Sequence, residues 1–367
     1  MLYSTDKENN LKRNKIFLPE NQIIKDKEEE NKECSEYRIN KNDISNIEKL
    51  NKLIEKKIPN FFDHYEIKEV IGKGSESLVY KVIYKKTGKP YTMKIIFFEK
   101  GRNINEFNIL NKLKNKNVIL FYGVYEIQKN ELDCIIMEFA KFGNLRDFKK
   151  NILKRDFLAE QLLCYFSFQI LNGLRYCHMC KIAHFDLKPQ NIVIDEYLNL
   201  KLIDFSVSLN YSKINSNTIK LPFRGTNFYM APEVIKSKTI DLKDINKIDL
   251  YSLGVILYNL AFCSYPYDLN SEDCNNYDKI YKKITNNELN FNNEDNNCYS
   301  KYFIDFLKQL LEKDINKRIN INQAIDNYWI KGAKILFDEK EKCFNASNFL
   351  INLMTDHFMS FDRYVNM

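Results

Sequence analysis

The spacing of apolar residues changes once along the chain, and this change limits the folds that the sequence can adopt. Residues 65–140 contain short runs of Val, Ile, Tyr and Phe between Gly and Lys turns, with one helical pattern at residues 103–114. After Asn144 the spacing becomes helical, and only residues 191–194 and 200–203 remain strand-like. The pattern predicts an α+β protein, with a small, mainly antiparallel β unit followed by a larger, mostly α-helical unit.

The segments that flank this body differ from it in composition. Residues 1–42 are rich in Lys, Glu and Asn and poor in apolar side chains, so we expect a disordered leader that buries too little surface to offset the entropy of ordering. In residues 43–60, Ser45 and Glu48 have the spacing of a capping box ahead of a helical apolar pattern, which predicts a short amphipathic helix. The tail, residues 331–367, is apolar enough that we expect it to pack on the domain.

Composition also narrows the class of protein. The longest apolar stretch, Tyr251–Cys263, is shorter than the roughly 20 residues of a membrane span, so we expect a buried helix and no membrane partner. The nine cysteines favour reduced thiols and a cytoplasmic or nuclear location. Basic and acidic residues, 56 and 49 in number, are mixed along the chain, so no nucleic-acid partner is predicted. Cys177-His178-Met179-Cys180 has metal-ligand spacing but no second pair nearby, and we interpret it as helix.

Two short patterns in the β unit contain residues suited to phosphate binding. Gly72 and Gly74 lie in a predicted strand–turn–strand, where backbone N–H groups can approach phosphate oxygens because no Cβ obstructs them. An ordinary hairpin turn explains the same glycines equally well. Lys94 ends the next predicted strand and Glu106 lies on the helical pattern after it, so an ion pair between them is compatible with the sequence. Two separately solvated side chains are the alternative.

Three further motifs follow in the helical unit. They are His184-Phe185-Asp186-Leu187-Lys188-Pro189-Gln190-Asn191, Ile203-Asp204-Phe205-Ser206 and Gly225-Thr226-Asn227-Phe228-Tyr229-Met230-Ala231-Pro232-Glu233. Together with the glycine pattern and Lys94, their order and intervals resemble the eukaryotic protein kinase superfamily from about Tyr65 to Ile330. The composition is similar to that of orphan kinases of apicomplexan parasites. The resemblance implies a bilobal kinase fold, with residues 61–140 as the N-lobe and 141–330 as the C-lobe.

The resemblance also implies an activity, the transfer of the γ-phosphoryl group of Mg-ATP to protein hydroxyl groups. Asp186 would accept the proton of the substrate hydroxyl, and Lys188 would neutralise charge on the transferring group. Asn191 and Asp204 would hold Mg²⁺, or Mn²⁺ in its place. Lys188 and Thr226 match the Ser/Thr branch of the family better than the tyrosine branch, so we expect protein substrates with serine or threonine acceptors.

A nucleotide site follows from the same resemblance. Lys94, held by Glu106, would contact the α- and β-phosphates. Met137 would be the gatekeeper, and backbone groups of Glu138 and Ala140 would bond to adenine. The remaining predicted nucleotide contacts are Ile71, Gly72, Lys73, Gly74, Val79, Thr92 and Val193.

Structural contacts are implied as well. Glu233 would pair with Arg318, and Asp249 would brace the backbone of the catalytic loop. An apolar stack would be formed by Leu110, Phe121, His184 and Phe205, so we expect a structural role for the histidine.

Phe185 departs from the family pattern, because an arginine ordinarily precedes the catalytic aspartate and grips a phosphorylated activation loop. We therefore expect weak dependence on loop phosphorylation. The loop contains four candidate phosphorylation sites and three substitute basic anchors, which are Ser208, Ser212, Ser216 and Thr218, and Lys213, Lys220 and Arg224.

Four other departures concern nucleotide and substrate binding. Ser206 replaces a glycine and Thr92 replaces a small alanine, and both changes can weaken nucleotide binding. A pseudokinase scaffold without turnover is therefore the alternative, although every residue with a direct charge role is present, which favours an active enzyme. Asn144 and Gln190 stand where kinases that select an upstream arginine have carboxylates, so we expect no strong preference for upstream arginine.

Overall fold

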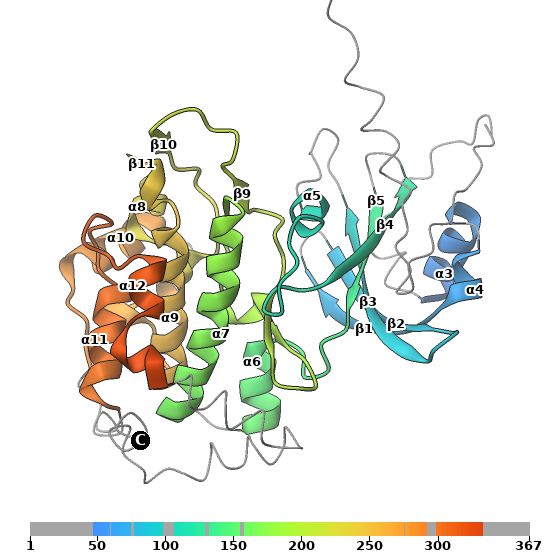
Figure 1. The fold of residues 1–367 in the computed structure, drawn as a ribbon, viewed down its shortest axis with the longest axis horizontal. Coiled ribbons are helices and arrows are strands. Elements are labelled where there is room, and N and C mark those ends of the chain that lie inside the picture. Colours follow the sequence, from blue (N-terminus) through green and yellow to red (C-terminus); the bar gives the residue numbers. More distant parts are fainter. Residues whose placement is uncertain are drawn as a thin grey trace, which may run out of the picture. The chain divides into compact units, whose positions relative to one another are not determined.

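The computed structural model describes residues 47–58, 60–74, 77–97, 106–128, 132–154, 158–274, 276–291 and 299–332 (Figure 1). The predicted leader and nearly all of the predicted tail lie outside these ranges. The described residues form two compact units. Unit 1 comprises those of Met1–Asn111 and Ile119–Ala140, and unit 2 comprises those of Lys112–Val118 and Lys141–Met367.

Unit 1 is built on a five-stranded sheet of strand order β1-β2-β3-β5-β4, in which every neighbouring pair is antiparallel. Its strands are β1 (Tyr65–Lys73), β2 (Ser77–Tyr84), β3 (Lys89–Phe97), β4 (Phe121–Gln128) and β5 (Leu132–Glu138). The small, mainly antiparallel β unit predicted from the sequence is therefore confirmed.

Alternation along the strands gives this sheet two distinct faces. In β2 the burial alternates strictly, with Leu78, Tyr80 and Val82 turned into an apolar cluster. The same cluster contains Leu50 and Ile54 of α3 (Ile47–Lys57), which lies over β1 and β4 (Figure 1). A second short helix, α4 (Phe61–His64), follows α3 and contributes to the same cluster. The first face is thus closed by the segment that precedes the sheet.

The helical insert of unit 1 ends earlier than predicted. The described helix, α5, spans Glu106–Leu110, although the apolar pattern predicted a helix over residues 103–114. The chain that follows it, Lys112–Val118, belongs to unit 2, where the N–H of Lys114 donates to the Tyr176 hydroxyl at 3.1 Å. This hydrogen bond replaces the one that a continued helix would make to Leu110 O.

Unit 2 is mostly helical and is centred on α7 (Glu160–Met179) and α9 (Lys247–Phe262), which pack on each other. Helix α9 is buried on nearly all sides, as the apolar stretch Tyr251–Cys263 predicted. None of the helices in the described ranges is long and apolar enough to cross a membrane. The other α-helices are α6 (Leu145–Asp147), α8 (Pro232–Ile235), α10 (Tyr277–Asn286), α11 (Lys301–Leu310) and α12 (Ile321–Ile325).

Short ladders in unit 2 correct one prediction. The expected pair, β7 (Ile192–Ile194) and β8 (Leu200–Leu202), is present. Two further pairs exist that the sequence pattern did not predict, and they are β6 (Ile182–Ala183) with β9 (Leu209–Asn210) and β10 (Thr218–Lys220) with β11 (Thr239–Asp241). Strands of two or three residues are held by backbone hydrogen bonds and are too short to show an alternating pattern.

Candidate active site

An ion pair on the second face of the unit 1 sheet holds Lys94. Its Nζ lies 2.8 Å from each carboxylate oxygen of Glu106, which begins α5. The two side chains are only 9% and 5% exposed, so the alternative of two solvated side chains is wrong. The two hydrogen bonds fix the direction of the Lys94 side chain.

The glycine turn between β1 and β2 has the predicted strand–turn–strand form. Gly72 is paired with Val79 and Lys73 with Leu78, and the N–H of Gly74 donates to Ser77 O at 2.9 Å. A Cβ at residue 74 would lie 2.9 Å from the Ser77 hydroxyl, so only glycine fits without a shift of that side chain. Ile71, before the turn, is exposed.

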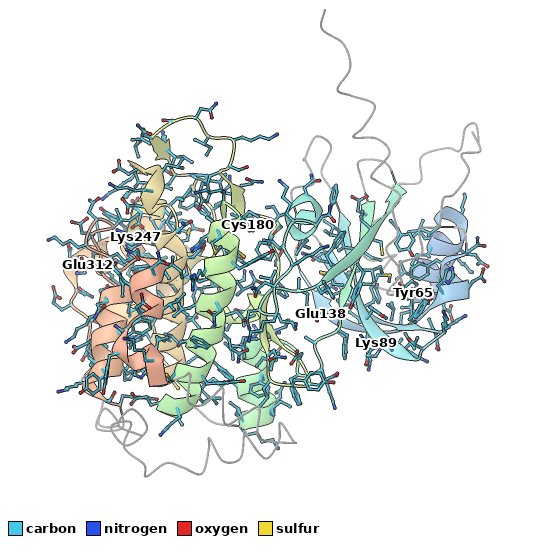
Figure 2. The ribbon with its side chains drawn as sticks, in the orientation of Figure 1. Tyr65, Lys89, Glu138, Cys180, Lys247 and Glu312 are labelled. Atoms are coloured by element: carbon cyan, nitrogen blue, oxygen red, sulfur yellow. The ribbon has the colours of Figure 1, made fainter. Side chains whose placement is uncertain are left out.

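The predicted adenine contacts in unit 1 lie on β2, β3 and the end of β5. Val79 and Thr92 are half-buried and alternate with the residues of the apolar cluster, which places them on the same face as Lys94. Met137 is buried in β5. Glu138, labelled in Figure 2, donates its N–H to Leu120 O at 2.9 Å, while its carboxylate accepts the Leu120 N–H at 2.7 Å.

The two remaining residues predicted to contact adenine are both half-buried. Ala140 follows β5 at the end of unit 1, and Val193 lies on β7 of unit 2.

In unit 2, the carboxylate of Asp186 is the centre of a hydrogen-bond network. Oδ2 accepts from Lys188 Nζ at 2.7 Å and from Asn191 Nδ2 at 3.0 Å, and Oδ1 accepts from the Thr226 hydroxyl at 2.6 Å. Lys188 Nζ also donates to the Thr226 hydroxyl, at 2.7 Å. The structure therefore brings three predicted site residues together. It adds Thr226 to the site, which the sequence indicated only as a marker of the Ser/Thr branch.

Asp249 fixes the backbone that leads into this network, as predicted. Its Oδ2 accepts the N–H of His184 and its Oδ1 that of Phe185, each at 2.9 Å. Phe185 has a φ of 65°, a left-handed conformation that costs a non-glycine residue about 1–2 kcal/mol. The two hydrogen bonds to a buried carboxylate offset this cost.

His178 is a further partner of Asp249 whose role the sequence did not reveal. Its Nε2 lies 2.8 Å from Asp249 Oδ2, and both side chains are buried. Burial alone would raise the pKa of Asp249, but the hydrogen bonds from His178 and the His184 backbone lower it below its ordinary value. His178 therefore helps to keep Asp249 ionised. Among the described residues, no group of three or more His, Cys, Asp or Glu side chains is arranged to hold a metal ion.

The two predicted metal ligands lie at adjoining points of the backbone. Ile203 donates its N–H to Asn191 O at 3.0 Å, and Asp204 follows directly. Because Asn191 Nδ2 donates to Asp186, its Oδ1 is left as an acceptor. Mg²⁺ typically takes one or two protein oxygens and completes its shell with phosphates and water, so this pair fits such an ion. Asp204 has a φ of 63°, a strained conformation that is common at functional sites.

Ser206 does not adopt the backbone conformation that would require a glycine at this position. Among the described residues, positive φ falls on Asp204 and not on Ser206. The serine therefore causes no backbone strain in this conformation.

His184 is structural, as predicted. Its ring is fully buried, lies 4.9 Å from the Phe205 ring between centroids, and makes a 2.9 Å hydrogen bond with Ile203 O. The N–H of Asp186 donates to His184 Nδ1 at 3.3 Å. Leu110 and Phe121, the other predicted members of the stack, belong to unit 1.

The segment between Asp204 and Glu233, which we call the activation segment, is tied to Phe185. Arg224 Nη1 donates to Val207 O at 2.8 Å, and its guanidinium carbon lies 5.8 Å from the Phe185 ring centroid. Partial burial lowers the pKa of Arg224 from its ordinary value.

One of the four candidate phosphorylation sites is wrong. Ser208 is fully buried, and its hydroxyl donates to His184 O at 3.0 Å, so it is a packing contact. The other candidates and the two lysine anchors are exposed, and they are Ser212, Ser216, Thr218, Lys213 and Lys220.

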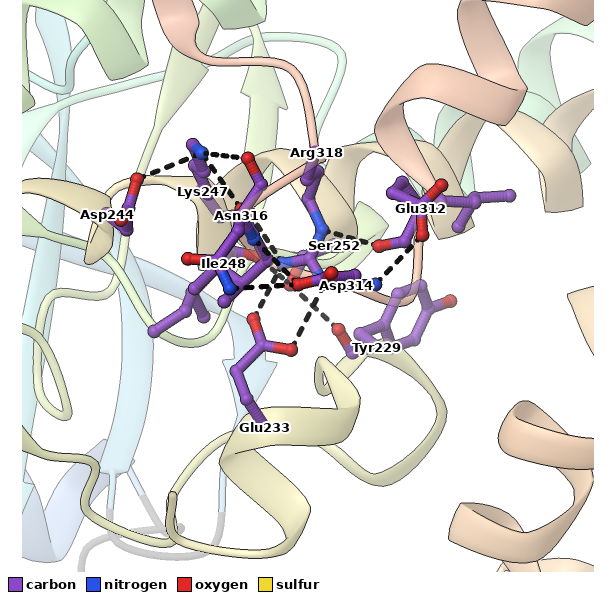
Figure 3. Close-up of polar contacts among 12 residues, drawn as sticks. Tyr229, Glu233, Asp244, Lys247, Ile248, Ser252, Glu312, Asp314, Asn316 and Arg318 are labelled. Carbon is purple, nitrogen blue, oxygen red and sulfur yellow. Dashed lines mark hydrogen bonds and ion pairs between the residues drawn. The ribbon is translucent and has the colours of Figure 1, made fainter. Parts of the chain in front are cut away.

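The predicted pair of Glu233 and Arg318 is confirmed. Arg318 Nη1 and Nη2 donate to the two carboxylate oxygens of Glu233 at 2.6 and 3.1 Å (Figure 3). Arg318 also donates to Glu312 O at 2.8 Å and Lys247 O at 3.1 Å. The pair is buried and joins the end of the activation segment to the loop after α11.

Comparison with known proteins agrees with this geometry. Residues 65–330 match the family described as the protein kinase domain. Death-associated protein kinase 2 of Mus musculus is 31% identical over 306 residues, which cover 78% of this chain and 77% of that protein. The protein of the same name from Homo sapiens is 32% identical over 285 residues, which cover 73% and 72%.

A third relative is the probable serine/threonine-protein kinase fhkB of Dictyostelium discoideum, 29% identical over 296 residues. These cover 77% of this chain and 24% of that protein. With the family match over most of its length, the chain belongs to the eukaryotic protein kinase superfamily and is a protein serine/threonine kinase.

Proposed function

We propose that the protein transfers the γ-phosphoryl group of Mg-ATP to serine or threonine hydroxyl groups of protein substrates. The observation that carries this proposal is the network in which Lys188, Asn191 and Thr226 all bond to the carboxylate of Asp186. A carboxylate fixed on three sides is oriented before substrate arrives, so its position requires no rearrangement during the reaction.

Each residue of the network has a distinct part in the proposed reaction. Asp186 orients the acceptor hydroxyl and takes its proton. Lys188, which is already directed at Asp186, places a positive charge beside the transferring group. Thr226 accepts from Lys188 while donating to Asp186, which keeps the two side chains in register. Asn191 and Asp204 would hold Mg²⁺, which when bound would neutralise negative charge on the phosphates.

In unit 1 the paired Lys94 supplies the cation for the α- and β-phosphates. The ion pair with Glu106 holds this buried ammonium group in place. Gly72 and Gly74 have no Cβ, so a phosphate group can approach the backbone of this turn closely.

The test is phosphate transfer from Mg-ATP by the purified protein, to itself and to generic acceptor proteins, beside Asp186→Asn and Lys94→Met. Transfer by the wild type alone is expected. If folded wild-type protein transfers nothing and ATP causes no thermal shift, the proposal fails and a pseudokinase scaffold takes its place.

We also propose that activity depends weakly on phosphorylation of the activation segment. Support comes from Phe185, which cannot bind a phosphate, and from Arg224, which holds the segment by contacts that need none. The triple variant Ser212→Ala/Ser216→Ala/Thr218→Ala is expected to keep most of the wild-type rate of transfer. Loss of nearly all activity in this variant would refute the proposal.

Two further proposals concern the sequence of the substrate and the location of the protein in the cell. We propose that peptides with an arginine upstream of the acceptor have no advantage, because Asn144 and Gln190 offer no carboxylate there. A peptide library scanned position by position tests this, and a dominant upstream arginine would contradict it. A cytoplasmic or nuclear location is expected from the cysteine content.

A further inference from the structure

Three basic side chains form a row on the first helical segment of unit 2. Helix α6 runs directly into η1 (Phe148–Leu153), a π-helical turn. Arg146, Lys150 and Lys154 recur every four residues along this segment, and all three are exposed. Arg146 and Lys150 are about one turn apart in the segment formed by α6 and η1, so they share one face, and Lys154 is the left-handed C-cap residue that directly follows η1. We call these three residues the basic ridge.

The opposite side of the segment is anchored in the core, which fixes the direction of the basic ridge. Leu145, Phe148 and Leu153 are all buried. The Phe148 ring lies 6.3 Å from that of Phe166 in α7 between centroids. A segment with one side in the core presents the other side to solvent.

The segment adjoins the catalytic loop. Asn144 caps α6 by accepting the Asp147 N–H at 3.0 Å, and it forms a backbone bridge with Val193 of β7. Helix α6 also packs against η2 (Pro189–Asn191), which ends in the asparagine that bonds to Asp186. The basic ridge therefore starts beside the residues that act on the acceptor hydroxyl.

The charges of the ridge are mostly uncompensated. Residues 141–154 contain five basic side chains and one acidic side chain, Asp147. Arg146 Nε donates to Asp147 at 3.2 Å, but that carboxylate also accepts from Asn144 Nδ2 at 2.7 Å. Within the described part of the chain, neither Lys150 nor Lys154 contacts a carboxylate.

We infer that the basic ridge binds carboxylate or phosphate side chains of the protein substrate on one side of its acceptor residue. This inference rests on the proposed function. The ridge extends along about two helical turns, each of about 5 Å, with Lys154 at the cap that follows η1. An extended peptide advances about 3.3 Å per residue, so the ridge spans about three substrate residues. Anionic side chains within such a stretch can each meet one cation.

A protein substrate fits this surface better than a nucleic acid. Single-stranded nucleic acids are usually held by aromatic side chains on which bases stack, beside the cations. On this segment Phe148 is buried, and the exposed apolar side chain is that of Ile152, which offers no stacking surface. The segment thus offers positive charge but no exposed aromatic side chain on which a base could stack.

The experiment compares two pairs of fluorescent peptides that all share a serine acceptor. Within each pair the peptides differ in four flanking residues, which are all Glu or all Gln, and these residues lie upstream of the acceptor in one pair and downstream in the other. The wild type is compared with Arg146→Gln/Lys150→Gln/Lys154→Gln. A matched control, Lys301→Gln/Lys308→Gln/Lys331→Gln, removes the same charge from exposed positions on and near α11. Both binding, by fluorescence anisotropy, and phosphate transfer are measured.

The wild type and the control are expected to prefer the Glu peptide of one pair. Exposed ion pairs contribute about 0.2–1 kcal/mol each, so three of them correspond to about threefold to a hundredfold in kcat/KM. The ridge variant should lose this preference through KM, with kcat on the Gln peptide unchanged. A reversed variant, Arg146→Glu/Lys150→Glu/Lys154→Glu, should prefer a Lys peptide instead, and the effect should weaken with salt.

Failure of this inference is separable from failure of the proposed function. Phosphate transfer without preference between the Glu and Gln peptides, or equal loss in ridge and control variants, would overturn the ridge alone. Preferential binding of the Glu peptide without any transfer would overturn the kinase activity and leave the ridge as a binding surface. Tighter, ridge-dependent binding of a single-stranded RNA of equal charge would also overturn the inference.

Discussion

Replacing Arg318 with alanine removes the partner of a fully buried carboxylate, and its effect can be worked out from the contacts. Arg318 makes two hydrogen bonds to Glu233 and one each to the Glu312 and Lys247 carbonyls. Removing one member of a buried ion pair typically costs 3–5 kcal/mol, about the range expected here, because the other charge is left uncompensated. We expect the free energy of unfolding of unit 2 to fall by about that amount.

The single tryptophan makes this loss measurable in unit 2 alone. Trp329 is fully buried and lies 4.9 Å from Phe303 and 5.3 Å from Phe306 between ring centroids, so unfolding changes its surroundings completely. With a urea dependence of about 3 kcal/mol per molar, the midpoint of its fluorescence change should fall by about 1–1.7 M. The control Lys308→Ala, at an exposed position, should stay within about 0.5 kcal/mol of the wild type.

The reasoning is refuted if Arg318→Ala costs less than about 1 kcal/mol, since the buried charge of Glu233 would then be solvated or neutralised at little cost. The pair can be tested further by combining Glu233→Ala with Arg318→Ala. Each single change leaves the other buried side chain without its partner. The double variant should therefore lose less free energy of unfolding than the sum of the losses in the two single variants.

Three further predictions follow from contacts in both units. Leu50→Ala should cost about 2–5 kcal/mol by opening a cavity under α3, seen as faster amide hydrogen exchange in β1 and β2, while exposed Glu55→Ala should leave exchange unchanged. Thr226→Ala should lower kcat for phosphate transfer about tenfold to a hundredfold through loss of a charge-assisted hydrogen bond, and Thr226→Ser should restore most of it. Burial raises the pKa of Tyr80 and of Tyr122 from 10.0 to about 12. Their stabilising contribution is therefore complete below pH 10 and lost as pH rises to about 12, and a tyrosinate absorbance titration matching that of the denatured chain would contradict this.

The parts of the fold and site that the sequence predicted are those with local signals. The strands of unit 1 are long enough for alternation to show, and the charged residues around Asp186 lie within one short motif. The pairing of Lys94 with Glu106 was compatible with the sequence, but the resemblance to the kinase family was needed to favour it over two solvated side chains. The apolar stretch of α9 indicated directly that this helix is buried.

The features that the sequence did not predict depend on contacts between distant segments. Ser208 looked available for modification, yet its hydroxyl is buried because β9 pairs with β6 and brings it to His184 O. His178 looked like an ordinary helix residue until Asp249, far along the chain, was placed beside it. Short ladders and single buried hydrogen bonds leave no periodic trace, so sequence patterns cannot reveal them.

The two-faced sheet of unit 1 has a consequence for how this protein can change over evolution. On the first face, Tyr80 and its neighbours meet Leu50 and Ile54, and such a cluster tolerates substitutions that conserve volume. A larger side chain in β2 would therefore be accepted when α3 acquires a smaller one. On the second face, Lys94 is constrained by a charge and a distance, and no exchange of volume can replace it. Alternate residues of one strand should therefore accept different substitutions. Among related chains, the residues of α3 and of the first face should change together.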